Sequence, residues 1–503
     1  MYRQAVWDEP LLIELSRSGR TGYSVPHYAA LEAPDPELSI PASLRREHLP
    51  LPELTEPQVV RHYHRLAQMN FGVDSNTYPL GSCTMKYNPK LADRIASLSG
   101  LSRLHPYQPI DTCQGILQIL YELGEMLAAI TGTAQVSLAP AAGAQGEFVG
   151  AAIIRAYIRE QGELGTRNEM LIPDSAHGTN PASASMVGFK VVKIPSTSAG
   201  LVDVEVLKSV VSRHTAGMML TVPNTLGLFE RDVQEITATV HETGGLMYYD
   251  GANMNALLGR LRPGDMGFDI VHMNVHKTLA TPHGGGGPGA GPVGVIKALV
   301  DYLPVPLIAR RGNRFRLRFD LPKTIGRVKG FLGHVSVLVR TYVYLLLLGK
   351  EGLPEVSAQA VLAANYLVRQ LDRTAYGEFA KGAPRFKHEV VVSAEPLRAA
   401  TSVRASDVAK ALLDEGLHPP TVYFPLTVPE ALMIEPTETE PVEALEVYAR
   451  ALNSIAKLAR RAPNAVRAAP RHTSVRRLDE VRASHPRTLT PTWRGLRSSG
   501  AHT

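Results

Sequence analysis

The sequence predicts an α/β protein whose larger domain is built on a mostly parallel β-sheet covered by helices on both faces. Between residues 135 and 296, short apolar runs alternate with longer segments in which apolar residues recur every three or four positions. Beyond residue 325 the pattern changes to long helical segments with few strands, which indicates a second, smaller α+β domain. We therefore expect four parts: an extended arm over 1–60, the larger domain over 61–324, the smaller domain over 325–465 and a basic tail over 466–503.

The elements of the larger domain follow in order. The arm contains much Pro, Leu and charge but no long periodic segment, and residues 77–90 are predicted to be a loop because of their Gly, Pro and Asn content. A helix is predicted over 111–130, with Asp111 as its N-cap and Gly132 ending it. Strands are predicted at 135–138, 170–172, 190–194, 217–222, 246–249, 268–274 and 293–296, and helices at 144–160, 204–213 and 233–243.

The smaller domain is predicted to begin with two long helices, over 325–349 and 354–373. A strand at 388–392 and a helix at 405–415 follow. The runs 422–426 and 432–435 are typical of a hairpin or edge pair, and a last helix is predicted over 441–461.

Composition excludes several classes of protein. The chain has 503 residues, 44% hydrophobic and 20% charged, as is typical of soluble globular proteins. Its net charge of +6 is modest, and many of the arginines lie beyond residue 460, where they would attract an acidic partner or form a solvated tail. Clustered aromatic residues for base contacts are absent from the sequence, so we do not predict nucleic-acid binding.

The location predicted for the chain is the cytoplasm. Two cysteines, Cys83 and Cys113, give neither a disulfide framework nor a metal-ligand spacing, which fits a reducing compartment. The first ten residues include acids and no uninterrupted apolar core, so they do not resemble a secretory signal. The apolar run 335–348 is shorter than the roughly 20 residues that a membrane-spanning helix needs, so no membrane segment is predicted.

Lys277 is the most informative residue of the sequence. It follows the apolar run 268–275 and precedes four consecutive glycines at 284–287, which can bring backbone close to a ligand. A lysine at the end of a strand can lose its proton, and a neutral amine can condense with an aldehyde. The alternatives are a phosphate-binding or a surface lysine.

Asp250 ends the apolar run 246–249, and a carboxylate in such a place needs a cationic partner. A pyridinium N–H would serve, and a buried arginine is the alternative. Ala252 is small enough to let a flat ring approach. An amine that can hold an aldehyde and an acid that can face a pyridine nitrogen are what a protein contributes to pyridoxal-phosphate chemistry.

Further candidates lie at other strand ends. The stretch 141–147 lies between a strand and a helix, where small residues leave backbone N–H groups free to bind a phosphate, although an ordinary strand-to-helix turn would look the same. His177 follows another strand and could stack on a cofactor ring or be a structural histidine. His276 offers a further donor for a phosphate. All of these positions are expected at the carboxyl ends of parallel strands, where ligands bind.

The chain resembles the second, or β, subunits of the glycine dehydrogenase (decarboxylating) family, the P-proteins of the glycine cleavage system. The resemblance covers about residues 12–480. Its most specific blocks are 78–90, 141–147, 177–183, 250–253, 276–289 and 418–440.

The resemblance implies the fold of the aspartate-aminotransferase-like (fold type I) pyridoxal enzymes and a function. Lys277 would hold pyridoxal 5'-phosphate covalently, Asp250 would pair with the pyridine nitrogen, and His177 would stack on the ring. The phosphate would be held by Gly143, Ala144, Gln145 and His276. The activity implied is the release of CO2 from glycine and transfer of the aminomethyl group to the lipoyl arm of the H-protein. An α subunit would complete an α2β2 heterotetramer, with the T-protein and L-protein as further members of the system.

Some positions depart from the family pattern. Ala139 stands where Gln is usual, Leu332 and His334 stand where Tyr and Asn are usual, and residues 386–389 replace a Cys-Met-His-Glu-like run. Other readings are a different pyridoxal decarboxylase or a sulfur-transferring enzyme, which would also use Asp250 and Lys277 but lack the 418–440 block. A catalytically silent subunit would lack Lys277. A nucleotide-binding P-loop would need a Gly-Lys-Ser/Thr ending that the glycine run does not have.

Overall fold

The computed structural model describes residues 2–23, 41–45, 51–105, 108–284, 289–378, 385–486 and 488. They form two compact units. One comprises residues 76–412 and 417–467 and contains both large sheets, and the other comprises 1–75, 413–416 and 468–503. The domain boundaries predicted at residues 60, 324 and 465 stay a prediction.

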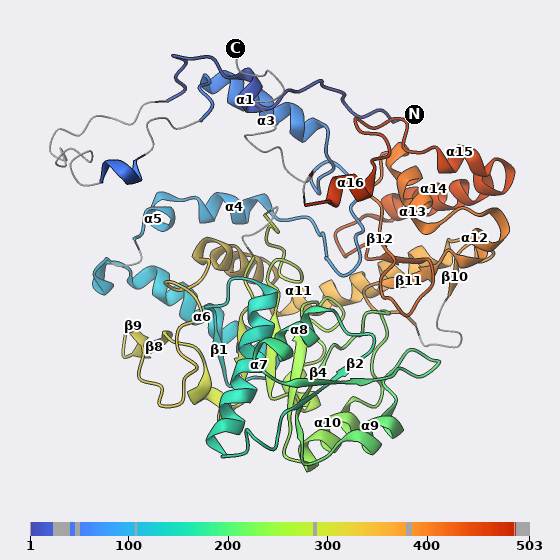
Figure 1. Cartoon of the computed structure of the whole chain (residues 1–503). Coiled ribbons are helices and arrows are strands. Elements are labelled where there is room, and N and C mark those ends of the chain that lie inside the picture. Colours follow the sequence, from blue (N-terminus) through green and yellow to red (C-terminus); the bar gives the residue numbers. More distant parts are fainter. Residues whose placement is uncertain are drawn as a thin grey trace. The chain divides into compact units, whose positions relative to one another are not determined.

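The larger sheet of the first unit is mixed but mostly parallel (Figure 1). Its strand order is β1-β7-β6-β5-β4-β2-β3, and only β7 runs antiparallel to its two neighbours, β1 and β6. The strands are β1 (Gln135–Ser137), β2 (Glu169–Pro173), β3 (Lys190–Ile194), β4 (Thr215–Leu220), β5 (Leu246–Gly251), β6 (Ile270–Met273) and β7 (Val293–Val295). Each coincides with a predicted strand to within two or three residues.

Helices cover both faces of this sheet because successive strand residues are apolar on both sides. Met218 and Leu220 of β4 pack into a core with α6, α9, α10 and the start of α11, whereas Met219 packs into the opposite core with α7 and α8. The helices are α6 (Gln114–Thr131), α7 (Gly143–Glu160), α8 (Thr179–Met186), α9 (Val204–Val210), α10 (Val233–Glu242) and α11 (Val335–Arg369). Two-sided burial explains why these strands are continuous apolar runs rather than alternating ones.

The first predicted helix begins later than expected. Asp111 lies in a 3-10 turn, η3 (Ile110–Thr112), and its carboxylate pairs with Arg314 instead of capping α6, whose N-cap is Cys113. Gly132 does end the helix, with a left-handed φ of 73°. Arg314 belongs to a hairpin formed by β8 (Leu307–Arg311) and β9 (Arg314–Arg318). The sequence did not predict this hairpin, because its arginines obscure the alternation of apolar and polar residues.

The helix predicted over 325–349 is wrong in its first ten residues. Phe331 and Gly333 have positive φ values of 60° and 82°, so α11 starts only at Val335. Gly349, with φ 60° and ψ −176°, interrupts α11 just before Pro354, and this break separates the two segments that were predicted as two helices.

A second, antiparallel sheet has the order β10-β11-β13-β12. Its strands are β10 (Gly377–Glu378), β11 (Val390–Ser393), β12 (Thr421–Val422) and β13 (Ala431–Ile434). The predicted pairing of the last two is confirmed, since Thr421 faces Met433. The helices that complete this part are α12 (Glu395–Thr401), α13 (Ala405–Asp414), α14 (Val442–Arg461) and α15 (Pro463–Arg467).

The predicted loop 77–90 connects the two sheets. Leu80 forms a bridge with Ile434 of β13 in the second sheet, and Gly81 N–H donates to Met433 O at 3.2 Å. A side chain at Gly81 would collide with Met433, so only glycine fits here. The loop ends where α4 (Lys90–Ala96) begins, followed by α5 (Ser99–Ser102), and α4 packs against α11.

The second unit is built from the two ends of the chain. Its helices are α1 (Leu12–Leu15), α3 (Glu56–Gln68) and α16 (Glu480–Ser484), with a short 3-10 turn, η2 (Ala42–Leu44). Glu9 of the arm pairs with His62 and Arg65 of α3, at 2.8 and 3.1 Å. Gln4 N–H donates to His472 O at 3.0 Å, so the arm also contacts the C-terminal stretch of its own chain.

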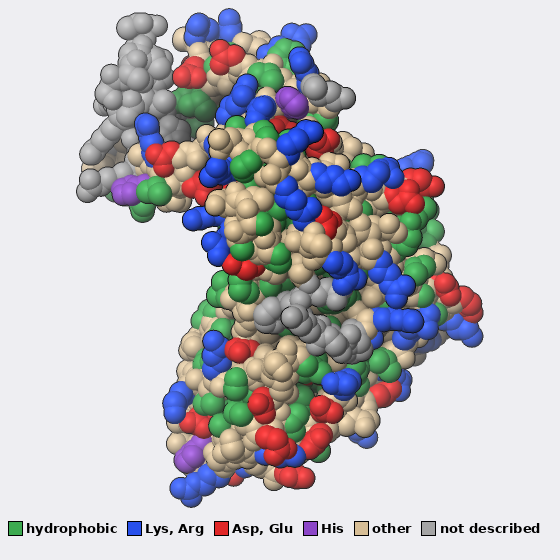
Figure 2. Space-filling view, turned by 90° about the vertical axis from the view of Figure 1, so that its right-hand side faces the viewer, with side chains coloured by type: hydrophobic (Ala, Val, Ile, Leu, Met, Phe, Trp, Pro, Cys, Tyr) green, Lys and Arg blue, Asp and Glu red, His purple; other side chains and the backbone are tan. Residues whose placement is uncertain are grey.

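On the face shown in Figure 2, Lys and Arg side chains are interspersed with acidic and uncharged ones over the described residues. Among the described helices, α11 included, none has the length and apolar character required to cross a bilayer.

Candidate active site

A cavity of about 300 Å³ opens at the carboxyl ends of β4, β5 and β6. Seven of the eight predicted site residues line it: Gly143, Ala144, His177, Asp250, Ala252, His276 and Lys277. Gln145 does not, because its side chain turns away to accept from Ala141 N–H and to donate to Val328 O. Of the glycine run only Gly284 is described, with φ 74°, and residues 285–288 lie outside the described part.

Lys277 lies in the turn that follows β6, and its side chain is half-buried. Its Nζ donates to the carbonyl oxygen of Ser82, 2.7 Å away. Ser82 belongs to the loop 77–90 and has a positive φ of 65°, which is uncommon for a residue with a side chain. The loop thus positions the amine at the wall of the cavity.

Asp250 is 1% exposed and ends β5. Its oxygens accept from Asn180 Nδ2 at 2.9 Å and from the Ala252 N–H at 3.0 Å, and His272 Nδ1 lies 3.6 Å away. Burial by itself would raise the pKa of Asp250, but His272 and these donors outweigh it and lower the pKa below its usual value. The carboxyl group is therefore ionised at neutral pH.

Glu147 of α7 reaches the same cavity. Asn180 donates to its Oε2 at 3.2 Å as well as to Asp250. Burial, together with the negative charge of Asp250, raises the pKa of Glu147 to about 9, so this acid stays protonated at neutral pH. The close approach of α7 depends on Gly146 and Gly150, where a side chain would collide with Gly291 O and with the Tyr248 ring.

His177 follows β2 and faces the cavity, where solvent reaches it. Its Nδ1 accepts from Thr179 N–H at 3.2 Å and lies 2.6 Å from Thr179 Oγ1, which places the ring proton on Nε2. Surrounding protein lowers the pKa of His177, with a further contribution from Lys277, so the ring is neutral. A neutral, flat ring fixed on one side can stack on a second ring.

The N-terminus of α7 forms one end of the cavity. Ala142 is its N-cap, and the backbone N–H groups of the first turn have no partner within a helix. A side chain at Gly143 would lie 2.2 Å from Asn274 Oδ1, so glycine is required there. His276 lies beside this end, and burial together with His283 and Lys277 lowers its pKa to about 3. Such a helix end binds anions.

Sequence comparison places this geometry in a family. The pattern of the family "Glycine cleavage system P-protein" matches residues 35–313, and that of "Glycine dehydrogenase, C-terminal domain" matches residues 356–473. The chain is 56% identical over 493 residues to the probable glycine dehydrogenase (decarboxylating) subunit 2 of Pyrococcus abyssi, covering 97% of each chain.

The chain belongs to the glycine cleavage system P-protein family.

A second relative with the same name, from Thermotoga maritima, is 53% identical over 488 residues. The match covers 96% of this chain and 100% of the relative. These similarities confirm the family predicted from the sequence. They also confirm, at the level of the family, its activity as glycine dehydrogenase (decarboxylating).

Solved structures confirm the fold. A glycine decarboxylase (P-protein) of the glycine cleavage system, in inhibitor-bound form, superposes with a TM-score of 0.71 at 21% identity, covering 86% of this chain and 99% of that one. The cysteine desulfurase CsdA from Escherichia coli gives 0.57 at 15% identity, covering 76% and 96%. The aspartate-aminotransferase-like, fold type I architecture predicted for this P-protein family member is thus correct.

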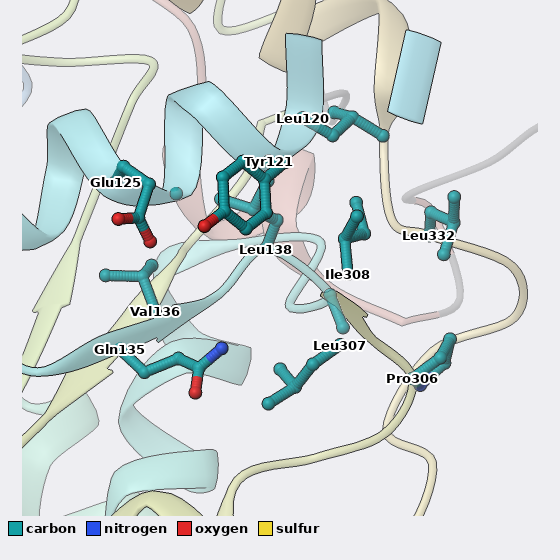
Figure 3. Close-up of a pocket in the computed structure, with 12 residues that line it drawn as sticks. Leu120, Tyr121, Glu125, Gln135, Val136, Leu138, Pro306, Leu307, Ile308 and Leu332 are labelled. Carbon is teal, nitrogen blue, oxygen red and sulfur yellow. The ribbon is translucent and has the colours of Figure 1, made fainter. Parts of the chain in front are cut away.

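The departures from the family pattern lie mostly outside the cavity of Lys277. Ala139 and Leu332 line a separate, small pocket of about 40 Å³, in which Leu332 lies near Ile308 and Pro306 (Figure 3). His334 Nδ1 donates to Gly289 O, 2.6 Å away. His388 and Glu389, from the unusual run 386–389, do line the cavity.

Sequence reasoning missed several residues of the cavity, namely Ser82, Glu147, Asn253, His388 and Glu389, and also Asn180, which donates to Asp250. Asn180 belongs to the block 177–183, and Ser82 to the block 78–90, both of which carry the family resemblance. The blocks marked the segments, but a block does not show which of its side chains point into the site.

Proposed function

We propose that this chain carries the pyridoxal 5'-phosphate of a glycine-decarboxylating complex and that Lys277 holds the cofactor covalently. The observation that carries the proposal is the placement of Lys277 and Asp250 in one cavity, at the ends of the paired strands β5 and β6. An amine and a buried, ionised carboxylate in one cavity fit the aldehyde and the pyridine nitrogen of this cofactor.

The residues present also fit the rest of the cofactor. The first turn of α7 and His276 offer a site for a phosphate. His177 and Ala252 line the space between, where a flat ring would lie. Gln145, which was predicted to contact the phosphate, would contribute its backbone N–H only, since its side chain holds Val328 and Ala141.

Pyridoxal phosphate, when bound, supplies an acceptor for the electron pair that remains as glycine loses CO2. Asp250 would hold a negative charge beside the pyridine nitrogen and so favour its protonated form. The carboxylate is fixed by Asn180, by the Ala252 N–H and by Thr221 Oγ1, which donates at 3.3 Å. The Ser82 carbonyl would hold the Lys277 amine whenever the amine is not attached to the cofactor, and so would keep it close to the site. His177 would offer a flat surface on which the ring could stack.

The partners follow from the names of the relatives, which are second subunits. We propose a first, α subunit that completes an α2β2 heterotetramer, and a lipoylated H-protein that receives the aminomethyl group, with the T-protein and L-protein completing the system. A cytoplasmic location is part of the same proposal, which the two free cysteines support.

The proposal is tested on the chain co-expressed with its first subunit. The purified complex is expected to absorb in the visible, to fix tritium from borohydride on Lys277, and to exchange labelled bicarbonate into glycine. A complex with no visible absorbance after incubation with pyridoxal phosphate would contradict the proposal. Release of sulfide from L-cysteine without glycine exchange would favour the sulfur-transferring alternative instead.

A further inference from the structure

The wall of the cavity beside Lys277 contains a group of side chains to which the mechanism above assigns no role. His388 and Glu389 line the cavity, and Glu435 lies behind them. One side-chain atom of each of the three lies within 4.8 Å of the others. All three are buried, with exposed fractions of 1%, 4% and 0%.

His388 is buried with its hydrogen-bonding capacity unused. Neither of its ring nitrogens has a hydrogen-bond partner, and Nε2 lies 3.7 Å from Glu389 Oε1, beyond hydrogen-bond range. Buried polar atoms are normally paired, so an unpaired pair of ring nitrogens at a cavity wall indicates a missing ligand. Burial and the charges of Lys277 and Lys86 lower the pKa of His388 to about 3, so the ring is neutral and offers one N–H.

The two carboxyl groups differ in their hydrogen bonds. Glu435 accepts three, from Asn253 Nδ2 at 2.7 Å, Thr84 Oγ1 at 2.8 Å and Thr84 N–H at 3.0 Å. Glu389 accepts one hydrogen bond, from Ser82 N–H at 2.9 Å, and its other oxygen, Oε1, lies 3.7 Å from His388 Nε2. Donors stabilise the ionised form, so Glu435, whose pKa burial raises to about 7, loses its proton before Glu389 does.

The cavity needs a receptor for the carboxylate of glycine. Among its described lining residues there is no arginine, and Lys277 is the one lysine. In the proposed function Lys277 is attached to the cofactor and does not remain free to pair with the substrate carboxylate. Among the buried, unpaired side-chain atoms of this lining, Asn274 Oδ1 can only accept, and His276 Nδ1 lies at the end proposed for the phosphate. His388, with Glu389 beside it, then remains to donate to a carboxylate.

We propose that His388 and protonated Glu389 bind the carboxylate of glycine as two neutral hydrogen-bond donors. This inference rests on the proposed function. Neutral donors suit a decarboxylation, because a cation paired with the substrate carboxylate would stabilise the ground state and lose that interaction as neutral CO2 leaves. The binding of glycine then depends on the proton of Glu389.

The groups that face Glu389 set the pH at which this proton is lost. They are Glu435 on β13, Lys277 after β6, Cys83 on the loop 77–90, and His388. Burial first, and then the charge of Glu435, raise the pKa of Glu389 to about 8. Below this pH the carboxyl donates to glycine, and above it the ionised Glu389 repels the substrate carboxylate.

The test compares glycine with methylamine, which has the same amine but no carboxylate. Dissociation constants for both are measured from ligand-induced changes in the visible absorbance of the loaded complex, between pH 6.5 and 9.5. Effects on the amine or on Lys277 act on both ligands and cancel in the ratio. For the wild type, the dissociation constant of glycine divided by that of methylamine is expected to rise about tenfold per pH unit above about pH 8.

Three variants complete the design. Glu389→Gln keeps a neutral donor at every pH, so the ratio of its two dissociation constants is expected to stay low and not to rise above pH 8. Glu389→Ala removes the donor and is expected to weaken glycine, but not methylamine, by about 10- to 150-fold at pH 7. Glu443→Gln makes the same chemical change on the exposed first turn of α14 and is expected to behave as wild type.

The outcomes separate this inference from the proposed function. A loaded complex whose ratio is independent of pH, and in which Glu389→Gln changes nothing, overturns the inference alone. A complex that takes up no pyridoxal phosphate overturns the proposed function and this inference with it. If Glu389→Ala does not fold, the pH dependence of wild type against the near-isosteric Glu389→Gln still decides.

Discussion

Glu147 and Asp250, two buried acids, share the side-chain amide of Asn180 as a common hydrogen-bond donor, at 3.2 and 2.9 Å. Two ionised carboxylates that share one donor would repel each other strongly in a buried site. The pair avoids this because Asp250, with further donors, takes the charge, while Glu147 stays protonated with a pKa of about 9. One acid thus holds a charge beside the cavity, and the other packs as a neutral group.

The first prediction concerns stability and pH. The carboxyl of Glu147 titrates near 4.5 when unfolded and near 9 when folded, so between these values the folded state binds the extra proton. The contribution of Glu147 to stability is then fully present below about pH 4.5 and is lost as the pH rises through about 9. Glu147→Gln removes this titration, so between pH 6 and 9 the variant should lose less stability than wild type, by up to about 1.4 kcal/mol per pH unit.

Urea unfolding of both complexes at several pH values measures this difference. Glu446→Gln, on α14, changes a partly exposed carboxylate and serves as the control. Identical pH dependence in Glu147→Gln and wild type would mean that Glu147 is ionised in the folded chain.

The second prediction concerns Asp250. Asp250→Asn keeps the size of the side chain but removes the charge that would face a pyridinium, while the phosphate contacts still hold the cofactor. Turnover should fall about 10- to 150-fold, the loss of one charge-assisted hydrogen bond, and cofactor retention should change less. The control Asp265→Asn alters an exposed aspartate, 56% accessible, and should have no such effect. Unchanged exchange of bicarbonate into glycine would assign the pyridine nitrogen to another residue.

The third prediction concerns His177. The ring is neutral and fixed by Thr179, so its role in the proposed site is a flat surface and not a charge. His177→Ala should weaken cofactor binding and shift the visible band, and His177→Phe should restore much of both. If the alanine variant keeps the wild-type spectrum and affinity, His177 is structural.

The fourth prediction concerns Lys277. Lys277→Ala and Lys277→Arg should both abolish the borohydride-trapped adduct and glycine–bicarbonate exchange, although arginine keeps a cation beside the Ser82 carbonyl. The matched control is Lys190→Ala, a lysine with a 71% exposed side chain. A fully active Lys277→Ala complex would be incompatible with the proposed function.

The parts of the site that the sequence predicted are those at strand ends. Asp250 and Lys277 end or follow continuous apolar runs, and a run buried on both faces has few alternative readings. Glu389 and Ser82 were not predicted, because their contact joins residues 307 positions apart and depends on how the loop 77–90 reaches the second sheet. Asp111 failed as an N-cap for a similar reason, since its partner Arg314 belongs to a distant hairpin.

The same limit applies to backbone conformation. The residues before α11 have an apolar spacing compatible with a helix, but the left-handed Phe331 and Gly333 end that possibility. Phenylalanine seldom adopts a positive φ, so its presence at position 331 does not predict a break in the helix. Gly349, by contrast, precedes Pro354 closely enough for the break between the two predicted helices to be recognised.

The last prediction is that this chain is inactive without its first subunit. Within the unit formed by the two chain ends, α3 exposes three apolar side chains spaced three residues apart: Val60, Tyr63 and Leu66, with exposed fractions of 47%, 56% and 39%. This spacing places them on one side of the helix. We expect this side, together with the arm that packs on α3, to contact the first subunit, because apolar side chains grouped on one face are typical of an interface.

Tyr63→Asp places a charge in that face and should weaken assembly with the first subunit, with a parallel loss of exchange activity. Size-exclusion chromatography and activity assays, with and without the first subunit and with H-protein present, measure both. Leu426→Asp makes a comparable change at a side chain that is 90% exposed and lies in the other unit, and it should assemble normally. Full activity of the chain with H-protein alone would refute the need for a first subunit. Normal assembly of Tyr63→Asp would instead move the interface away from α3, since a buried, unpaired aspartate at a contact costs far more than an exposed one.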